Sequence, residues 1–117
     1  MINKRRRALR YGFFAEICSA IYLIIKGWKI MALRHRNHFG EIDIIAMRMN
    51  IVIFVEVKAR KTVEEAIVSV SDKSQKRIKN ASKNWIAKQI NSNKFSYRYD
   101  LIAIIPWRLP KHFTNAF

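Results

Sequence analysis

Two acidic residues and one basic residue in neighbouring apolar segments have the types and spacing that phosphate chemistry requires. The segment IVIFVEVKAR, residues 51–60, is rich in β-branched apolar residues, yet it carries Glu56 and Lys58. Side chains alternate across a strand, so these two residues share one face of it. The preceding apolar segment carries Glu41 and Asp43, again two positions apart. Solubility alone does not explain four charges in the most apolar part of the chain.

The two segments are predicted to form a hairpin with a two-residue turn at residues 49–50. In that register Asp43 lies directly across from Glu56, and Glu41 lies across from Lys58. Directly opposed Cβ atoms are roughly 4.5–5.5 Å apart, and like charges in that relation destabilise the pair. The two carboxylates must therefore share a proton, take a cationic neighbour or bind a cation.

A divalent cation would give this cluster a chemical role. Mg²⁺ binds one or two carboxylates and completes its coordination with water and phosphate oxygens, and Mn²⁺ prefers similar ligands. Lys58 would then stabilise charge on a phosphate or help to position the attacking water. The alternative without chemistry is a salt-bridge ladder in which Glu41 pairs with Lys58, and Lys58 also screens Glu56. Exposed pairs contribute only about 0–1 kcal/mol, so such a ladder would be weakly specified.

The elements that hold these residues are predicted to alternate between helices and strands. The predicted order is a helix over residues 4–26, a strand over 28–36, two strands within 40–60, a helix from Ser71 or Asp72 to about Ile90, and a strand over 97–105. Gly27 ends the first helix, which we interpret as an amphipathic core helix, and Pro106 ends the last strand. The segment after Pro106 has no assignment. This order predicts an α/β domain with a mixed central sheet flanked by two long helices.

The charge of the chain indicates its class of partner. With 23 Lys and Arg against 8 Asp and Glu, the formal net charge is +15, which favours polyanions, nucleic acid first and anionic membrane second. On the second predicted helix Ile78, Ala81, Trp85 and Ile86 share one arc, and basic residues lie opposite. The residues predicted to hold backbone phosphates are Lys73, Lys76, Arg77, Lys83 and Lys88 on this helix, with Arg5, Arg6 and Arg7 in the basic N-terminal arm.

Length and cysteine use predict a single cytoplasmic domain over residues 1–117. The lone Cys18 cannot form an intramolecular disulfide and indicates a reducing setting. The basic start and the apolar run 13–25 imitate a signal peptide, but Glu16 interrupts the run and it is too short to span a bilayer. We therefore expect no stable membrane association, although attachment of the basic stretch to a membrane surface stays open. Trp28, Trp85 and Trp107 are predicted as core or interface residues.

The residues around the acidic pair resemble a known family. Asp43, thirteen positions before Glu56, with EVK closing an apolar strand, resembles the D…ExK core of the PD-(D/E)XK nuclease superfamily. More closely, GEIDIIA at 40–46 and FVEVKAR at 54–60 are similar to the YraN family of small, predicted endonuclease-like proteins. The similarity extends to GFFAEICSA, AIVSVSDKSQKRI and RYDLIAI, and so covers residues 12–104.

This resemblance implies a restriction-endonuclease-like fold and a set of site residues. Asp43 and Glu56 match the metal-binding carboxylates and Lys58 matches the catalytic lysine. Glu16 matches an acidic position that approaches the metal in related nucleases resembling Holliday-junction resolvases. Independently of the family, Glu16 has small residues, Gly12 and Ala20, four positions to either side on its helix, which would let it reach a crowded site. The alternative is a polar-face residue that pairs with a nearby arginine.

The activity implied by the resemblance is hydrolysis of phosphodiester bonds by an endonuclease that depends on Mg²⁺ or Mn²⁺. DNA is favoured over RNA as the substrate, with branched and flapped DNA included. Related junction resolvases work as dimers, so a homodimer is compatible with the resemblance, but the sequence identifies no dimer face. The alternative function is a nucleic-acid-binding protein that keeps the nuclease fold without chemistry, because a fold does not establish a reaction.

Overall fold

The computed structural model describes the backbone of residues 2–117 and the side chains of residues 10–117. The elements in chain order are α1 (Ile2–Ile25), β1 (Lys29–Asn37), β2 (Gly40–Arg48), β3 (Ile51–Ala59), α2 (Val63–Val68), α3 (Asp72–Ala87), the short 3-10 helix η1 (Ser92–Lys94), β4 (Ser96–Ile104) and β5 (Lys111–Phe113). The strands form one sheet in the order β1-β2-β3-β4-β5. Strands β3 and β4 run parallel and the other neighbours antiparallel, so the predicted mixed sheet with flanking helices is confirmed.

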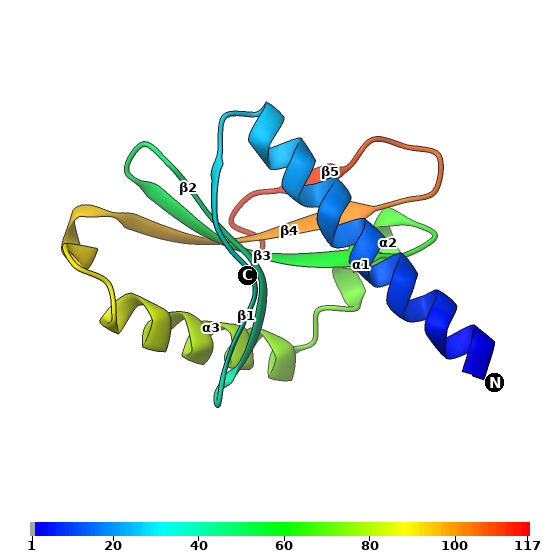
Figure 1. Cartoon of the computed structure of the whole chain (residues 1–117), viewed down its shortest axis with the longest axis horizontal. Helices are drawn as coiled ribbons and strands as arrows, with labels where there is room; N and C mark the ends of the chain where they lie inside the picture. The colour runs from blue at the N-terminus through cyan, green and yellow to red at the C-terminus, as the bar shows by residue number, and fades with distance from the viewer. Residues whose placement is uncertain (1) are drawn as a thin grey trace.

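The helices cover opposite faces of the sheet, as Figure 1 shows with α1 in blue above the strands and α3 in yellow-green below them. Between α1 and the sheet, Ala15 and Leu23 pack against Ile53 and Ile102 among other buried residues. On the other face, the arc predicted for the second helix is confirmed. Its buried members Ile78 and Ala81 pack in one cluster with Ile42, Ile45, Val52 and Phe54. The core therefore has two layers, one on each side of the sheet.

The predicted end of the first long helix and the predicted start of the second agree with the structure, whereas the second helix ends at Ala87 and not at about Ile90. Gly27 has a φ of +93°, and the N–H groups of Gly27 and Trp28 donate to carbonyls in the last turn of α1. Only a residue without a Cβ adopts this left-handed conformation freely, which is why the helix ends there. The Ser71 hydroxyl accepts a hydrogen bond of 3.1 Å from the Ser74 N–H and so caps α3.

The hairpin has the predicted two-residue turn and register. Met49 and Asn50 form the turn, and Arg48 pairs with Ile51. The β2–β3 pairing continues only as far as Ile44 and Val55. Beyond that point β2 stays paired with β1, and β3 stays paired with β4 along its whole length. The two central strands therefore separate into a fork, and Asp43 lies directly beyond the last pair.

The amphipathic interpretation of the first helix is wrong. Its outward face carries large apolar side chains that are more than half exposed, namely Phe13, Phe14, Ile21, Ile24 and Ile25. A helix that crosses one face of a sheet buries a single stripe, and α1 has apolar residues all round, so the remaining ones face outward. No helix in the described part of the chain is both long and apolar enough to cross a membrane.

Besides the single-turn 3-10 helix η1, two elements were not predicted from the sequence. Helix α2 begins after Thr62, whose hydroxyl accepts from the Glu65 N–H at 3.1 Å, and it buries Ala66. Strand β5 belongs to the segment after Pro106 and pairs antiparallel with β4. Both elements are too short for their periodicity to be recognised in the sequence.

Candidate functional site

The candidate site lies in the fork where β2 and β3 separate. The backbone N–H of Val57 faces the gap and has no partner on β2 there. The Asp43 carboxylate takes that place, because its Oδ2 accepts a hydrogen bond of 2.8 Å from the Val57 N–H. The side chain thus replaces a backbone carbonyl, and Asp43 is fixed across the gap.

All four residues predicted for catalysis line one cavity in this fork. Its volume is about 380 Å³. Asp43 comes from β2, Glu56 and Lys58 come from β3, and Glu16 comes from α1. Gly12 and Ala15 of α1 also line it, and a Cβ at Gly12 would meet nothing within 4 Å. The predicted small neighbour Gly12 is therefore at the cavity, whereas Ala20 is buried in the core.

The cavity raises the proton affinity of Glu56. Burial is the largest cause, and the adjacent Asp43 carboxylate adds to it through a hydrogen bond and through its charge, so the pKa of Glu56 rises to about 9. Lys58 opposes the shift, with its Nζ 3.7 Å from Glu56 Oε1. The Glu56 side chain is 12% exposed and that of Lys58 is 22% exposed. Two carboxylates in contact, with one of them nearly buried, need a proton or a cation between them.

Glu16 combines the two roles that the sequence left open. It lines the cavity, and its Oε2 accepts a bond of 2.5 Å from Arg34 Nε on β1. Burial raises the pKa of Glu16, the Arg34 hydrogen bond lowers it, and the charge of Asp43 raises it. Arg34 itself has a φ of +50°, and its guanidinium lies 4.9 Å from the centre of the Phe13 ring. No pattern in the sequence singles out Arg34, because the fold alone brings β1 to α1.

The predicted pairing of Glu41 with Lys58 is wrong. Glu41 Oε2 accepts from Arg36 Nη2 at 2.9 Å, and Lys58 pairs with Glu56. The reason is the fork. At Glu41, strand β2 is paired with β1 and no longer with β3, so Glu41 does not lie across from Lys58. Glu41 lines a separate depression on the β1–β2 turn together with Arg36 and Arg77.

The donor set of the fork suits a hard cation. Asp43 and Glu56 offer oxygen ligands only. A divalent ion between them would offset both the burial and the Asp43 charge that raise the pKa of Glu56. Among the side chains that the structure describes, no three His, Cys, Asp or Glu residues are grouped to hold a metal ion. The predicted third ligand, Glu16, is engaged by Arg34. The pair alone fits Mg²⁺ or Mn²⁺, because Mg²⁺ usually takes one or two carboxylates and fills its other positions with water and phosphate oxygens.

The structure does not bring the predicted phosphate-holding helix to this cavity. All five of its predicted residues are exposed, with Lys73, Lys76, Arg77 and Lys83 on α3 and Lys88 at its C-cap. Helix α3 covers the sheet face opposite to α1 (Figure 1), whereas the cavity is lined by α1. Of the five, Arg77 lines the depression at the β1–β2 turn. The side chains of Arg5, Arg6 and Arg7 lie outside the described residues.

A second charged cluster, which the sequence analysis missed, fixes the C-terminal segment. Asp100 on β4 is fully buried. It accepts two hydrogen bonds from Arg98 at 2.8 and 2.9 Å, one from His112 at 2.7 Å, and one from the Asn115 N–H at 2.9 Å. Burial alone would raise the pKa of Asp100, but these donors outweigh it, so the pKa lies below its ordinary value. An aspartate inside the apolar string DLIAI was the available signal.

The comparison with known proteins places the chain in a family. A family model described as the uncharacterised protein family UPF0102 matches residues 15–104. The chain belongs to the UPF0102 family. A UPF0102 protein of Rhizobium leguminosarum bv. trifolii is 50% identical over 113 residues, covering 97% of this chain and 93% of the relative. UPF0102 proteins of Sinorhizobium fredii and Agrobacterium fabrum are 46% and 44% identical over 115 residues, covering 98% of this chain and 94% of each relative.

Membership of UPF0102 confirms the predicted resemblance to the YraN family, which is the same family. The match includes all four of the predicted catalytic residues that line the cavity, Glu16, Asp43, Glu56 and Lys58. It ends at Ile104, before β5. The UPF0102 description carries no activity, so the likeness to the PD-(D/E)XK nucleases stays a prediction, and the function must be argued from the site.

Proposed function

We propose that this UPF0102 protein is a metal-dependent nuclease that hydrolyses phosphodiester bonds in DNA. One observation carries the proposal. Asp43 and the nearly buried Glu56 interact directly in a cavity at the fork of two strands, and Lys58 lines the same cavity. A protein loses stability by holding two carboxylates in this way, so the arrangement suggests a functional reason.

The residues of the fork would have separate roles in phosphodiester hydrolysis. Asp43 and Glu56 would hold Mg²⁺ or Mn²⁺, which when bound supplies Lewis-acid polarisation of the phosphate and acidifies water. Asp43 is oriented for this by the Val57 N–H. Lys58 carries a positive charge at the cavity, where it stabilises charge that develops on a phosphate or orients the attacking water. The space above Gly12 leaves room for the substrate at the α1 side.

Glu16 and Arg34 would position the substrate. Their ion pair ties α1 to β1 beside the fork, and the Glu16 side chain is only 16% exposed. Arg34 is 46% exposed, so its guanidinium also meets solvent. A phosphate that enters the cavity can interact with Arg34 at this edge, because a guanidinium has donors to spare after one bond to a carboxylate.

Cleavage assays on purified protein test the proposal. The substrates are branched, flapped and linear DNA and an RNA of the same sequence, each with and without Mg²⁺ or Mn²⁺. We expect DNA cleavage that requires the ion, and loss of at least about a hundredfold in rate for Asp43→Ala and Lys58→Ala. Glu41→Ala is the matched control, because this carboxylate is two residues from Asp43 but lies outside the cavity. If Asp43→Ala and Lys58→Ala cut as well as the wild type, the site assignment fails.

A second function is favoured by a specific observation. Glu16 is paired with Arg34, Glu56 is paired with Lys58, and no group of three metal-ligating side chains is found among the described ones. These contacts suit a nucleic-acid-binding protein that keeps the nuclease fold without chemistry. Such a protein binds DNA or RNA in a salt-sensitive way that is indifferent to divalent ions. Glu56→Gln would then leave binding unchanged or stronger, with no cleavage at any metal concentration.

A further inference from the structure

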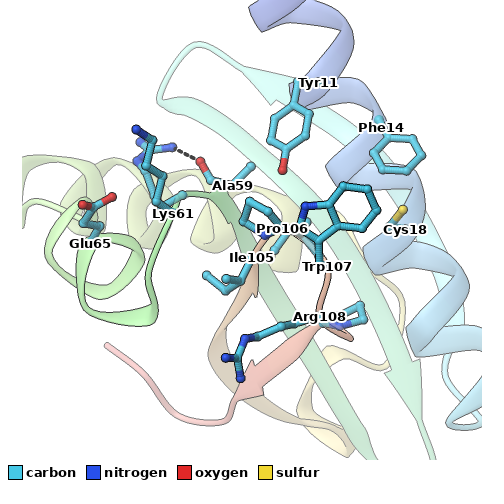
Figure 2. Close-up of a pocket in the computed structure, with 13 residues that line it drawn as sticks. Tyr11, Phe14, Cys18, Ala59, Lys61, Glu65, Ile105, Pro106, Trp107 and Arg108 are labelled. Carbon is cyan, nitrogen blue, oxygen red and sulfur yellow. Dashed lines mark hydrogen bonds between the residues drawn. The ribbon is translucent and has the colours of Figure 1, made fainter.

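A second and larger cleft opens directly beside the carboxylate cavity. Its volume is about 990 Å³. The two spaces share Tyr11 of α1, Ala59 at the end of β3, and Arg60. Figure 2 shows its lining, with Tyr11 and Phe14 projecting from α1, Trp107 of the connection between β4 and β5 drawn beside them, and Lys61 and Glu65 farther from α1. A ligand in this cleft would therefore reach the fork through a common boundary.

Trp107 is held out from the protein by a strained turn. It is fully exposed, with 103% of its reference surface accessible, so of the predicted core or interface positions the core is wrong for this tryptophan and the interface stays a prediction. The Arg108 N–H donates to the Ile105 carbonyl at 3.2 Å, which closes a turn with Pro106 and Trp107 at its centre. Trp107 has a φ of +63° at a position where Gly or Asn is usual. Since Trp107 gains no packing from this conformation, the strain suggests a function.

The rest of the cleft combines aromatic rings with positive charge. Tyr11 and Phe14 are 42% and 58% exposed, so three rings are open to a ligand. The charged residues that line the cleft are basic Arg60, Lys61 and Arg108 and acidic Glu65. Exposed aromatic rings within a positive groove are the recurring features of sites for single-stranded nucleic acid, in which the rings stack on bases and the cations hold the backbone.

We propose that this cleft binds the unpaired bases of a single-stranded segment whose backbone continues into the carboxylate cavity. The inference rests on the proposed nuclease function and gives its substrate class. Bases inside a duplex are stacked on each other and hide the faces that Trp107 needs, so a duplex gains little from the cleft. A strand end, a flap or the unpaired arm of a branch presents free bases, and Arg60, at the boundary of both spaces, meets the phosphate between them.

Binding without divalent ion, in EDTA, tests the stacking separately from any cleavage. The probes are a fluorescent twelve-nucleotide oligothymidylate, a sugar-phosphate strand of the same length without bases, and a blunt duplex. Trp107→Gly suits the positive φ and removes no packing, so this variant is expected to fold. Met49→Gly is the matched control, because Met49 is 87% exposed with a φ of +54° in the turn at the far end of the hairpin.

We expect the wild type to bind the oligothymidylate more tightly than the other two probes. Trp107→Gly should weaken that binding by about 5- to 150-fold, as expected from the loss of one stacked base, and Met49→Gly should leave it unchanged. Tryptophan fluorescence should be quenched on binding, and Trp107→Phe should abolish the quenching, because Trp28 is buried and Trp85 is packed against Phe54.

Equal binding of the oligothymidylate by Trp107→Gly and the wild type overturns the inference. So does equal binding of the strand without bases, or saturation of the cleft by an apolar peptide that the oligothymidylate does not displace. Failure of the nuclease proposal gives a different result, in which stacking is present and no probe is cut with Mg²⁺. Equal cleavage of a flap by the wild type and Trp107→Gly would support the nuclease function and contradict the proposed base-stacking cleft.

Discussion

At the scale of single residues, the fork holds two adjacent carboxyl groups, and this lowers the stability of the folded protein. Glu56 interacts with Asp43 in a nearly buried position, and Lys58 compensates for this only in part. Asp43 also accepts a hydrogen bond from the Val57 N–H, which has no partner on the neighbouring strand β2. The Asp43 carboxylate is therefore needed for the fold of the fork, whereas the Glu56 carboxylate raises the free energy of the folded state. This difference separates the two acids experimentally.

Glu56→Gln is expected to stabilise the protein in EDTA. The pKa of Glu56 is about 9 in the folded protein against 4.5 ordinarily, so between these values the folded state holds a proton that the unfolded state has lost. Stability therefore falls as pH rises from about 4.5 to about 9. Glutamine mimics the protonated acid and removes this loss, worth on the order of 1–3 kcal/mol at pH 7. Urea unfolding at pH 5, 7 and 9 measures the difference, which should grow with pH. Parallel pH profiles for the two proteins would contradict it.

Asp100→Asn is expected to have the opposite effect on stability. Asp100 is fully buried and accepts from Arg98, His112 and the Asn115 N–H. Its replacement leaves these donors without the carboxylate, including the Arg98 guanidinium, whose side chain is 25% exposed, at a cost of about 1–3 kcal/mol. Its pKa is lowered in the folded state, so the stability that it contributes is present above the ordinary value of 3.8 and is lost as pH falls through the folded pKa. The gap between variant and wild type should therefore close in strong acid. Urea unfolding at pH 7 and pH 2, with hydrogen exchange at residues 111–117, checks this.

Periodicity predicted the acidic pair because a tight turn and strict alternation fix which residues face each other. The register of the hairpin predicted that Asp43 and Glu56 share one face, although the ladder ends one pair earlier, at Ile44 and Val55, so the two are not directly opposed in a paired position. Alternation and turn signals describe only neighbouring segments, so they could not predict the roles of Arg34 and Trp107. Arg34 meets Glu16 only because β1 passes under α1, and Trp107 reaches the cleft through a turn that its sequence does not favour. Local pattern carries no information on contacts between distant elements.

At the scale of elements, two glycines in the region of α1 serve different purposes. Gly12 lies inside the helix at the cavity, where a Cβ would meet nothing within 4 Å. Gly27 ends the helix at a φ of +93°, where a Cβ would meet only the Arg48 side chain at an ordinary 3.7 Å. Space is available at both positions, so the backbone conformation decides the outcome of a substitution.

Gly12→Ala should therefore stabilise the protein by about 0.5–1 kcal/mol, because alanine favours a helix interior over glycine. Gly27→Ala should destabilise it by about 1–2 kcal/mol, because an L-residue is strained in the left-handed region. Thermal unfolding of the two variants beside the wild type makes each the control for the other. Shifts of the same sign in both variants would show that the description of the helix end is wrong.

The sequence predicted the elements whose ends carry a signal. Gly27 and Ser71 marked the ends of long helices, and residues 49–50 marked the hairpin turn. Helix α2 and strand β5 were missed because neither is long enough to show a period. The outward face of α1 was misjudged because its apolar residues surround the helix, and no pattern on the helix itself tells which stripe meets the sheet.

At the scale of the whole molecule, the basic residues of α3 and the carboxylates of the cavity lie on different faces of the sheet. The net charge of +15 draws in polyanions over the entire surface. The cavity and the aromatic cleft lie beside α1, whereas α3 covers the opposite face (Figure 1). The depression with Arg36, His38 and Arg77 lies between them at the β1–β2 turn. This turn is one route by which a long nucleic acid on α3 would reach the fork.

This arrangement predicts that α3 affects affinity without affecting the chemical step. The double change Lys76→Ser with Lys83→Ser removes two exposed cations from α3. The double change Lys26→Ser with Lys29→Ser removes two exposed cations from the turn after α1 and the first position of β1, so the net charge falls equally in both variants. If α3 holds phosphates, the first variant alone should reduce the slope of log binding constant against log salt, by up to about 2. Its cleavage rate at saturating DNA should match that of the wild type, since neither lysine lies at the fork. Equal slopes for the two variants would mean that only the total charge matters, and a lower saturated rate would mean that α3 reaches the reacting phosphate.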